Sequence, residues 1–316
     1  MFYCMQRLFL YYYSKLNTMD NTDIPYVFIL DWDGTIAGNV SFQSQHASVV
    51  STLKSYKIKP NVQYTIPPAF GPRSKLIRPG FSTWMKALQT MYKEVYFFIY
   101  TASEKSWANL EIAWVEKLHN IKFMRPIFTR DDCFNDIGNN GTRKSIAKIY
   151  PRIISSIVRE RGPSHPLSIS QRKSILENHL VIIDNNAVYN DRQSNLLLCP
   201  DYNYTVFENL LTLIPKDVRN IPAIQQLIYT LISNGYMCKL PDMNDDGMAA
   251  LSSQYTWLAS KCKALHEQNK AYMQDDFWKH LTKIIVKNRI YDFSPHIIKQ
   301  LQDSCWKHAK KKHALQ

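Results

Sequence analysis

The chain has 316 residues and a formal net charge of +13, and 45% of its residues are hydrophobic. This length suits one sizeable domain plus an accessory part, and no apolar run approaches the ~20 residues of a membrane-spanning helix. The positive charge favours acidic partners, among them phosphoproteins and nucleic acids. The six cysteines include no Cys-x-x-Cys pair, which argues against structural zinc and indicates a reducing compartment, cytoplasmic or nuclear.

A short, mostly apolar run at residues 26–30 leads directly into two carboxylates, Asp31 and Asp33. Such a run, bounded by polar residues, predicts a fully buried strand of a parallel sheet. Ligands of these sheets lie beyond the carboxyl ends of the strands. We therefore expect Asp31 at a strand tip and Asp33 one pleat later, pointing the same way.

Two carboxylates this close repel each other unless a cation or a shared proton relieves the repulsion. Phosphoryl transfer can use both groups. Asp31 would attack phosphorus and bind Mg²⁺, whereas a protonated Asp33 would donate to the leaving oxygen and later deprotonate the hydrolytic water. The alternative is a solvated junction between strand and turn, because Asp and Gly are ordinary turn residues.

The elements that follow repeat the pattern of strand, helix and strand. Residues 36–76 predict a loop or small strands over the site, and an amphipathic helix follows Gly80. A second buried strand is predicted at 95–100, with a helix after it and a weaker strand at 121–128. A third buried strand at 180–184 also ends in a carboxylate. This alternation predicts an α/β fold with a doubly wound parallel sheet.

The composition divides the chain into three parts. Residues 1–25 are expected to be a loose extension, with an interfacial or targeting segment as the alternative. Residues 26–215 form the predicted α/β domain, with an insertion at about 151–178 whose basic and polar residues favour a solvated surface. Residues 216–316 are predicted to be a helical accessory region that ends in a basic tail.

Residues 242–247, Asp-Met-Asn-Asp-Asp-Gly, copy the start of a calcium-binding loop. Such a loop needs a bidentate Glu at its twelfth position, where this chain has Ser253. We therefore predict an acidic turn rather than a calcium site.

A phosphoaspartate mechanism also needs donors for the phosphoryl oxygens and ligands for Mg²⁺. Thr101 follows the second strand, where its hydroxyl and the backbone N–H groups near Ala102 could bind phosphoryl oxygens. Lys144 could neutralise charge on the phosphoaspartate, although a lone Lys lies by default on the surface. Asp184 and Asn185 offer oxygen ligands to a hard cation. The predicted Mg²⁺ ligands are Asp31, Asp33, Asp184 and Asn185.

The run Asp31-Trp-Asp33-Gly-Thr35 after an apolar strand resembles the first motif of the haloacid-dehalogenase (HAD) superfamily. Its second Asp is the mark of the phosphatase and phosphotransferase branches. The order Asp, Thr, Lys, Asp along this chain is similar to the four superfamily motifs. The resemblance implies a HAD-like Rossmannoid sheet, and the helical extension predicted after residue 215 lies outside it.

Further motif-like segments are Lys75–Phe81, Tyr100–Ser103, Phe128–Cys133, Arg143–Ile146 and Ile182–Asn186. They resemble segments of the FCP/SCP-type, or NLI-interacting-factor-like, phosphatases, which act on the C-terminal domain of RNA polymerase II. The resemblance covers about residues 26–215 and implies that Arg130 contacts substrate phosphate, whereas Arg78 either touches substrate or braces the sheet edge. Two departures are Asp-Trp-Asp-Gly-Thr for the usual Asp-Leu-Asp-Glu-Thr, and Asn186-Ala187 for Ser-Pro.

The resemblance implies a Mg²⁺-dependent phosphatase of phosphoserine or phosphothreonine proteins, such as a polymerase C-terminal-domain repeat. A second possibility is a nucleic-acid 3′-end phosphatase, which the charge and the basic tail would suit. A third is a non-catalytic binding protein on the same fold. Relatives of that third kind often lose the catalytic carboxylates, but Asp31 and Asp33 are both present.

Overall fold

The computed structural model describes residues 23–39, 46–60, 67–136, 141–205, 213–228, 260, 263–264 and 266–313. Apart from residues 23–25, the predicted N-terminal extension lies outside this part, and so does the acidic turn predicted at 242–247. Within the described part, no helix combines the length and apolar composition that crossing a membrane requires.

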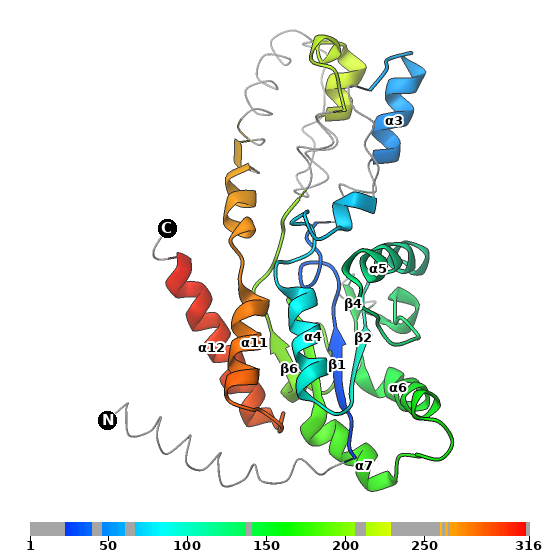
Figure 1. Ribbon diagram of the computed structural model, residues 1–316. Helices are drawn as coiled ribbons and strands as arrows, with labels where there is room; N and C mark the ends of the chain where they lie inside the picture. Colours follow the sequence, from blue (N-terminus) through cyan, green and yellow to red (C-terminus); the bar gives the residue numbers. More distant parts are fainter. Residues whose placement is uncertain are drawn as a thin grey trace.

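Four parallel strands form the central sheet, in the spatial order β2-β1-β5-β6 (Figure 1). Leu30 of β1 lies beside Ile99 on one side and Ile183 on the other, so three strands end at the same level. The predicted α/β fold with a parallel sheet is confirmed. The weaker candidate at 121–128 forms no strand, and a single bridge joins Tyr100 to Phe128 there. The bounds are β1 Tyr26–Leu30, β2 Val95–Ile99, β5 Leu180–Asp184 and β6 Leu196–Leu198.

Side chains along the strands alternate between two cores, as the two-residue repeat of a strand requires. Phe28 and Leu30 face the first core, whereas Val27 and Ile29 face the second. Helices on both faces make the sheet doubly wound. The first core is covered by α4 (Phe81–Met91), α5 (Lys105–His119), α11 (Phe277–Lys287) and α12 (Pro295–His313). The second is covered by α6 (Ile146–Arg161) and the short helix η3 (Ile175–His179).

Helix α6 begins at a side-chain cap and runs into the segment predicted as an insertion. The Ser145 side chain accepts a hydrogen bond from the backbone N–H of Lys148, which satisfies one free donor of the first turn. Ile153 and Ile157 are buried against the sheet, while Arg152 and Arg159 of the same helix are exposed. Residues 151–161 therefore belong to the helical layer of the sheet rather than to a surface excursion.

The two C-terminal helices complete the first core. Trp278 and Leu281 of α11 are buried beside α4, and Leu301 of α12 is buried in the same cluster. Helix α12 also covers the edge strand β6, because Trp306 Nε1 donates to the Leu198 carbonyl at 2.9 Å and the Leu198 N–H donates back to α12. The predicted helical extension is thus present and packs into the core of the sheet domain.

Shorter elements connect these layers. The segment 36–76, predicted as a loop or small strands, contains the helix α3 (His46–Ser55), on which Val49 and Leu53 are buried one turn apart. Strands β3 (Phe134–Asp136) and β4 (Gly141–Arg143) form an antiparallel pair. The remaining turns of helix are η1 Pro67–Phe70, η2 Arg130–Asp132, α7 Ile169–Ser174, η4 Gln193–Asn195 and η5 Lys216–Val218.

Candidate active site

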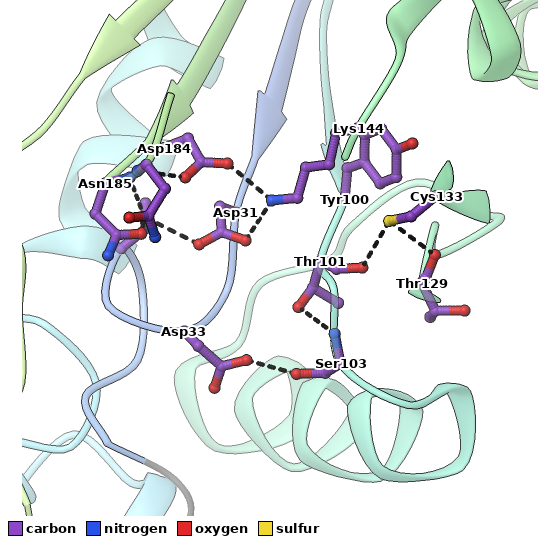
Figure 2. A network of polar contacts seen from close by, with 12 residues as sticks. Asp31, Asp33, Tyr100, Thr101, Ser103, Thr129, Cys133, Lys144, Asp184 and Asn185 are labelled. Atoms are coloured by element: carbon purple, nitrogen blue, oxygen red, sulfur yellow. Dashed lines mark hydrogen bonds and ion pairs between the residues drawn. The ribbon is translucent and has the colours of Figure 1, made fainter. Parts of the chain in front are cut away.

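Polar side chains from three strand tips and one loop meet at the carboxyl edge of the sheet (Figure 2). Asp31 directly follows β1, Asp184 ends β5, and Thr101 lies two residues beyond β2. All three side chains are buried, and so is that of Lys144. Since parallel strands bring their carboxyl ends to one edge, the fold itself gathers these groups, as the sequence predicted.

Lys144 lies between two of the carboxylates. Its Nζ donates to Asp31 Oδ1 at 2.6 Å and to Asp184 Oδ2 at 2.8 Å. Burial by itself lowers the pKa of Lys144, but the charges around it, chiefly that of Asp31, raise the pKa well above its usual value. Burial raises the pKa of Asp31 and Lys144 opposes this rise. The ammonium group therefore relieves the repulsion between the two buried carboxylates.

Lys144 lies between β4 and α6, and its backbone is hydrogen-bonded to the loop that follows β5. Its N–H donates to the Val188 carbonyl, and its own carbonyl accepts from the N–H of Asn190, both at 2.9 Å. The rings of Tyr100 and Tyr189 flank the ammonium group at 5.7 and 5.6 Å from their centroids. Neither tyrosine was given a role from the sequence: Tyr100 opens a segment that carries the family resemblance, and Tyr189 lies outside every such segment.

Asp33 faces a different partner. Ser103 Oγ donates to Asp33 Oδ2 at 2.5 Å, and the Ser103 N–H donates to Thr101 Oγ1 at 3.1 Å. Asp33 Oδ1 is buried and has no hydrogen-bond partner among the described residues. Burial raises the pKa of Asp33, and the bond from Ser103 opposes this. The orientation in Figure 2 suits a proton donor, whereas a Mg²⁺-ligand role for the Asp33 side chain stays a prediction that this orientation does not support.

Asn185 and Thr35 bring further oxygens beside Asp31. Thr35 Oγ1 lies 3.3 Å from Asp31 Oδ2 and 3.1 Å from Asn185 Oδ1, and it accepts the Asn185 N–H at 3.0 Å. A hydroxyl has one proton, so it cannot donate to both oxygens at once. One acceptor oxygen at this point is consequently left for another positive group.

These oxygens fit the ligand preference of Mg²⁺. This ion binds oxygen, usually through one or two carboxylates, and keeps several water ligands. Asp31, Asp184 and Asn185 could supply such a set. Among the described residues, no group of three or more His, Cys, Asp or Glu side chains could hold a metal ion by itself.

Gly34 permits the close approach that shapes this set. A Cβ at Gly34 would lie 2.5 Å from Asn185 Nδ2 and 2.7 Å from Asp201 Oδ1, and the residue has a φ of +78°. Asn185 Nδ2 donates to Asp201 Oδ1 at 2.9 Å. Asp201 thereby orients the amide so that its oxygen faces Thr35. Sequence reasoning missed Asp201, which lies outside every motif.

Arg130, another predicted phosphate contact, lies at the edge of the buried cluster. Arg130 is exposed, its Nε donates to the Ala102 carbonyl at 2.8 Å, and its guanidinium lies 3.6 Å from Glu104. Arg130 is therefore placed next to the Thr101 loop but outside the buried cluster, so its predicted phosphate contact stays a prediction.

Arg78 is buried and has its donors occupied within the fold. It donates to both carboxylate oxygens of Asp275, at 2.9 and 2.8 Å, and to the Pro200 carbonyl at 2.8 Å. Of the two roles that the sequence left open for Arg78, the structure supports the bracing one. The partner carboxylate comes from the segment just before α11, which no motif had connected with Arg78.

Comparison with protein families agrees with this geometry. A family model described as NLI interacting factor-like phosphatase matches residues 26–217. The chain belongs to this family. Family membership identifies the protein as a phosphatase, that is, a phosphoric monoester hydrolase, of the protein-phosphatase-like kind. The buried cluster around Asp31 lies wholly inside the matched region.

Two solved structures are similar to the phosphatase. One is the fission yeast RNA polymerase II CTD phosphatase Fcp1, in a variant bound to beryllium fluoride, with 15% identity and a TM-score of 0.32. The other is also Fcp1, described as an essential RNA polymerase II CTD phosphatase, with 14% identity and a TM-score of 0.32. Each alignment covers 87% of this chain and 70% of the other chain. No curated protein matches the phosphatase.

Proposed function

We propose that the phosphatase is Mg²⁺-dependent and forms a phosphoaspartate at Asp31 during the hydrolysis of phosphoserine or phosphothreonine in proteins, such as a polymerase C-terminal-domain repeat. The observation that carries this proposal is the difference between two carboxyl groups one residue apart. Asp31 is bonded to the cation of Lys144, which opposes the rise that burial gives to the pKa of Asp31, to about 7. Asp33 has no cation bonded to it, accepts from the neutral hydroxyl of Ser103, and burial raises its pKa. Such paired environments assign one group as nucleophile and the other as acid.

In the first step, an oxygen of Asp31 forms a bond to phosphorus as the bond from phosphorus to the substrate oxygen breaks. Asp33 gives its proton to the departing alcohol. In the second step, Asp33 takes a proton from water, whose oxygen attacks phosphorus, and the carboxylate of Asp31 is released. When bound by Asp31, Asp184 and Asn185, Mg²⁺ would supply charge neutralisation on the phosphoryl oxygens.

The substrate class is supported by family membership and by the net charge of +13, which attracts acidic phosphopeptides. A nucleic-acid 3′-end phosphatase would also benefit from this charge. The two substrates differ in what surrounds the phosphate, so a direct comparison of turnover discriminates between them.

The test uses the full chain and para-nitrophenyl phosphate with Mg²⁺, then with a chelator. We expect Asp31→Asn to abolish turnover, because an amide oxygen is a poor nucleophile, and the chelator to do the same. The exposed Lys173→Gln serves as a control that keeps full activity. Turnover by the Asp31→Asn variant would contradict the mechanism.

A second assay compares a phosphoserine peptide with a 3′-phosphorylated oligonucleotide. We expect a higher kcat/KM for the peptide. Preference for the oligonucleotide, with binding that weakens steeply as salt rises, would instead favour the nucleic-acid reading.

A further inference from the structure

A carboxyl group that the proposed reaction does not use is buried beside Trp32, the residue between Asp31 and Asp33. Glu111 lies on α5 between core residues, and only 1% of it is exposed. Its Oε2 accepts a hydrogen bond from Trp32 Nε1 at 2.9 Å, whereas Oε1 has no partner among the described residues. A buried carboxylate without a cation is costly, so this position demands a reason.

The group escapes that cost by keeping its proton. Burial is the main cause that raises the pKa of Glu111, to about 8; an ionised Asp33 would add to the rise, and the indole groups of Trp32 and Trp107 oppose it. The raised pKa favours the neutral acid, which still offers an acceptor oxygen to the indole N–H.

Trp32 is the residue between the two catalytic candidates, and it is held at both ends. Its carbonyl accepts the N–H groups of Ile36 at 3.0 Å and Ala37 at 2.9 Å, which closes the turn after β1. Its fully buried indole is held by Glu111. Rotation of the backbone about this residue would therefore have to break a hydrogen bond on one side or the other.

We infer that Glu111 is a positioning residue for the proposed phosphoryl transfer, and that by holding the Trp32 indole it fixes the direction in which Asp33 points relative to Asp31. This inference rests on the proposed function. The acceptor oxygen of Glu111 is what matters, and its charge is not needed. Misplacement of a reacting group by about 1 Å can cost ~10²-fold in rate, so a remote anchor of this kind has a measurable effect.

The test measures kcat and KM on para-nitrophenyl phosphate for Glu111→Leu, Glu111→Gln, Trp32→Phe and the double variant Trp32→Phe/Glu111→Leu. We expect Glu111→Leu to lower kcat by roughly 10- to 100-fold with little change in KM. Glu111→Gln keeps an acceptor oxygen and should restore most of the loss. The double variant should be no worse than the poorer single variant, because both changes remove the same bond. An exposed glutamate on α6, changed as Glu160→Leu, is the matched control.

Three results would overturn the inference: wild-type kcat in Glu111→Leu, a Glu111→Gln variant as poor as Glu111→Leu, or additive losses in the double variant. If Glu111→Leu does not fold, Trp32→Phe removes the same bond from the other side, and a wild-type kcat there also refutes the inference. An inactive Asp31→Asn beside an unaffected Glu111→Leu would sink this inference alone, whereas an active Asp31→Asn would sink the proposed function with it.

Discussion

Asp31 and Asp33 are separated by a single residue, yet their carboxyl groups have different partners. The expectation that both point the same way extends the pleat of β1 through Asp33, but β1 ends at Leu30. Gly34, with its positive φ, lies in the turn that follows, and Asp33 is directed to Ser103. The apolar run thus predicts the strand and the place of Asp31, while the direction of Asp33 depends on a turn whose partners lie far away in sequence.

The cation between Asp31 and Asp184 allows a first prediction at this scale. In Lys144→Met the two carboxylates face each other in a buried site, so we expect the free energy of unfolding to fall by about 3–5 kcal/mol. We also expect kcat to fall by ~10²–10³-fold, because charge on the phosphoryl group loses a preorganised partner. Urea unfolding and turnover measure the two effects. The exposed Lys173→Met should change neither, and a Lys144→Met variant with wild-type stability would contradict the buried ion pair.

The pKa of Glu111 gives a prediction about pH. Its ordinary pKa is 4.5 and its pKa in the folded chain is about 8. The folded state therefore binds this proton more tightly, so its stabilising contribution is complete below pH 4.5 and is lost as pH rises towards 8. Glu111→Gln cannot ionise, so its stability relative to the wild type should increase across this window, by at most about 5 kcal/mol. Thermal unfolding at several pH values tests this, and parallel curves for the two proteins would refute it.

At the scale of elements, uninterrupted apolar runs in the sequence correctly predict the buried strands. The runs at β1, β2 and β5 each lie between polar residues, and each forms a strand that is buried in the sheet. The strand β6 has only three residues, which is too short to give a pattern. Helix α6 mixes arginines with buried isoleucines, and its basic content concealed its apolar face.

The tie between Arg78 and Asp275 links distant elements to the active site. Arg78 also holds the Pro200 carbonyl, and the next residue, Asp201, orients the amide of Asn185. Asp275→Ala leaves a buried guanidinium without its carboxylate, so we expect a loss of about 3 kcal/mol in stability and weaker Mg²⁺ binding. Denaturant unfolding and Mg²⁺ titration of activity measure these effects.

A paired replacement separates the two consequences. Arg78→Met/Asp275→Leu removes both charges, so stability should return towards the wild-type value while Mg²⁺ binding stays weak, because the Pro200 carbonyl has lost its donor. The exposed pair of Glu267 and Lys270 is the control, and Glu267→Ala should change stability by less than about 0.5 kcal/mol. Normal Mg²⁺ binding in the paired variant would show that Arg78 does not position this loop.

At the scale of the whole molecule, the family match ends at residue 217 but the hydrophobic core does not. Phe277, Leu281 and Ile285 recur at helical spacing as an apolar stripe, and they are buried on α11. Such a stripe indicates which face of the helix is buried, but it does not indicate which element that face packs against. Periodicity alone therefore indicated an accessory region, whereas the structure packs α11 on α4 and α12 on β6.

This packing predicts that residues 26–217 do not fold without the C-terminal helices. Their removal would expose the apolar surface of α4 and the open edge of β6, and an uncovered edge strand promotes aggregation. We expect the fragment to lack a cooperative thermal transition and to bind a hydrophobic dye, and we expect residues 266–313, co-expressed as a second chain, to restore part of its solubility. The full chain carried through the same purification is the control. A fragment that unfolds cooperatively, with turnover equal to that of the full chain, would show that α11 and α12 are dispensable for the core that holds Asp31 in place.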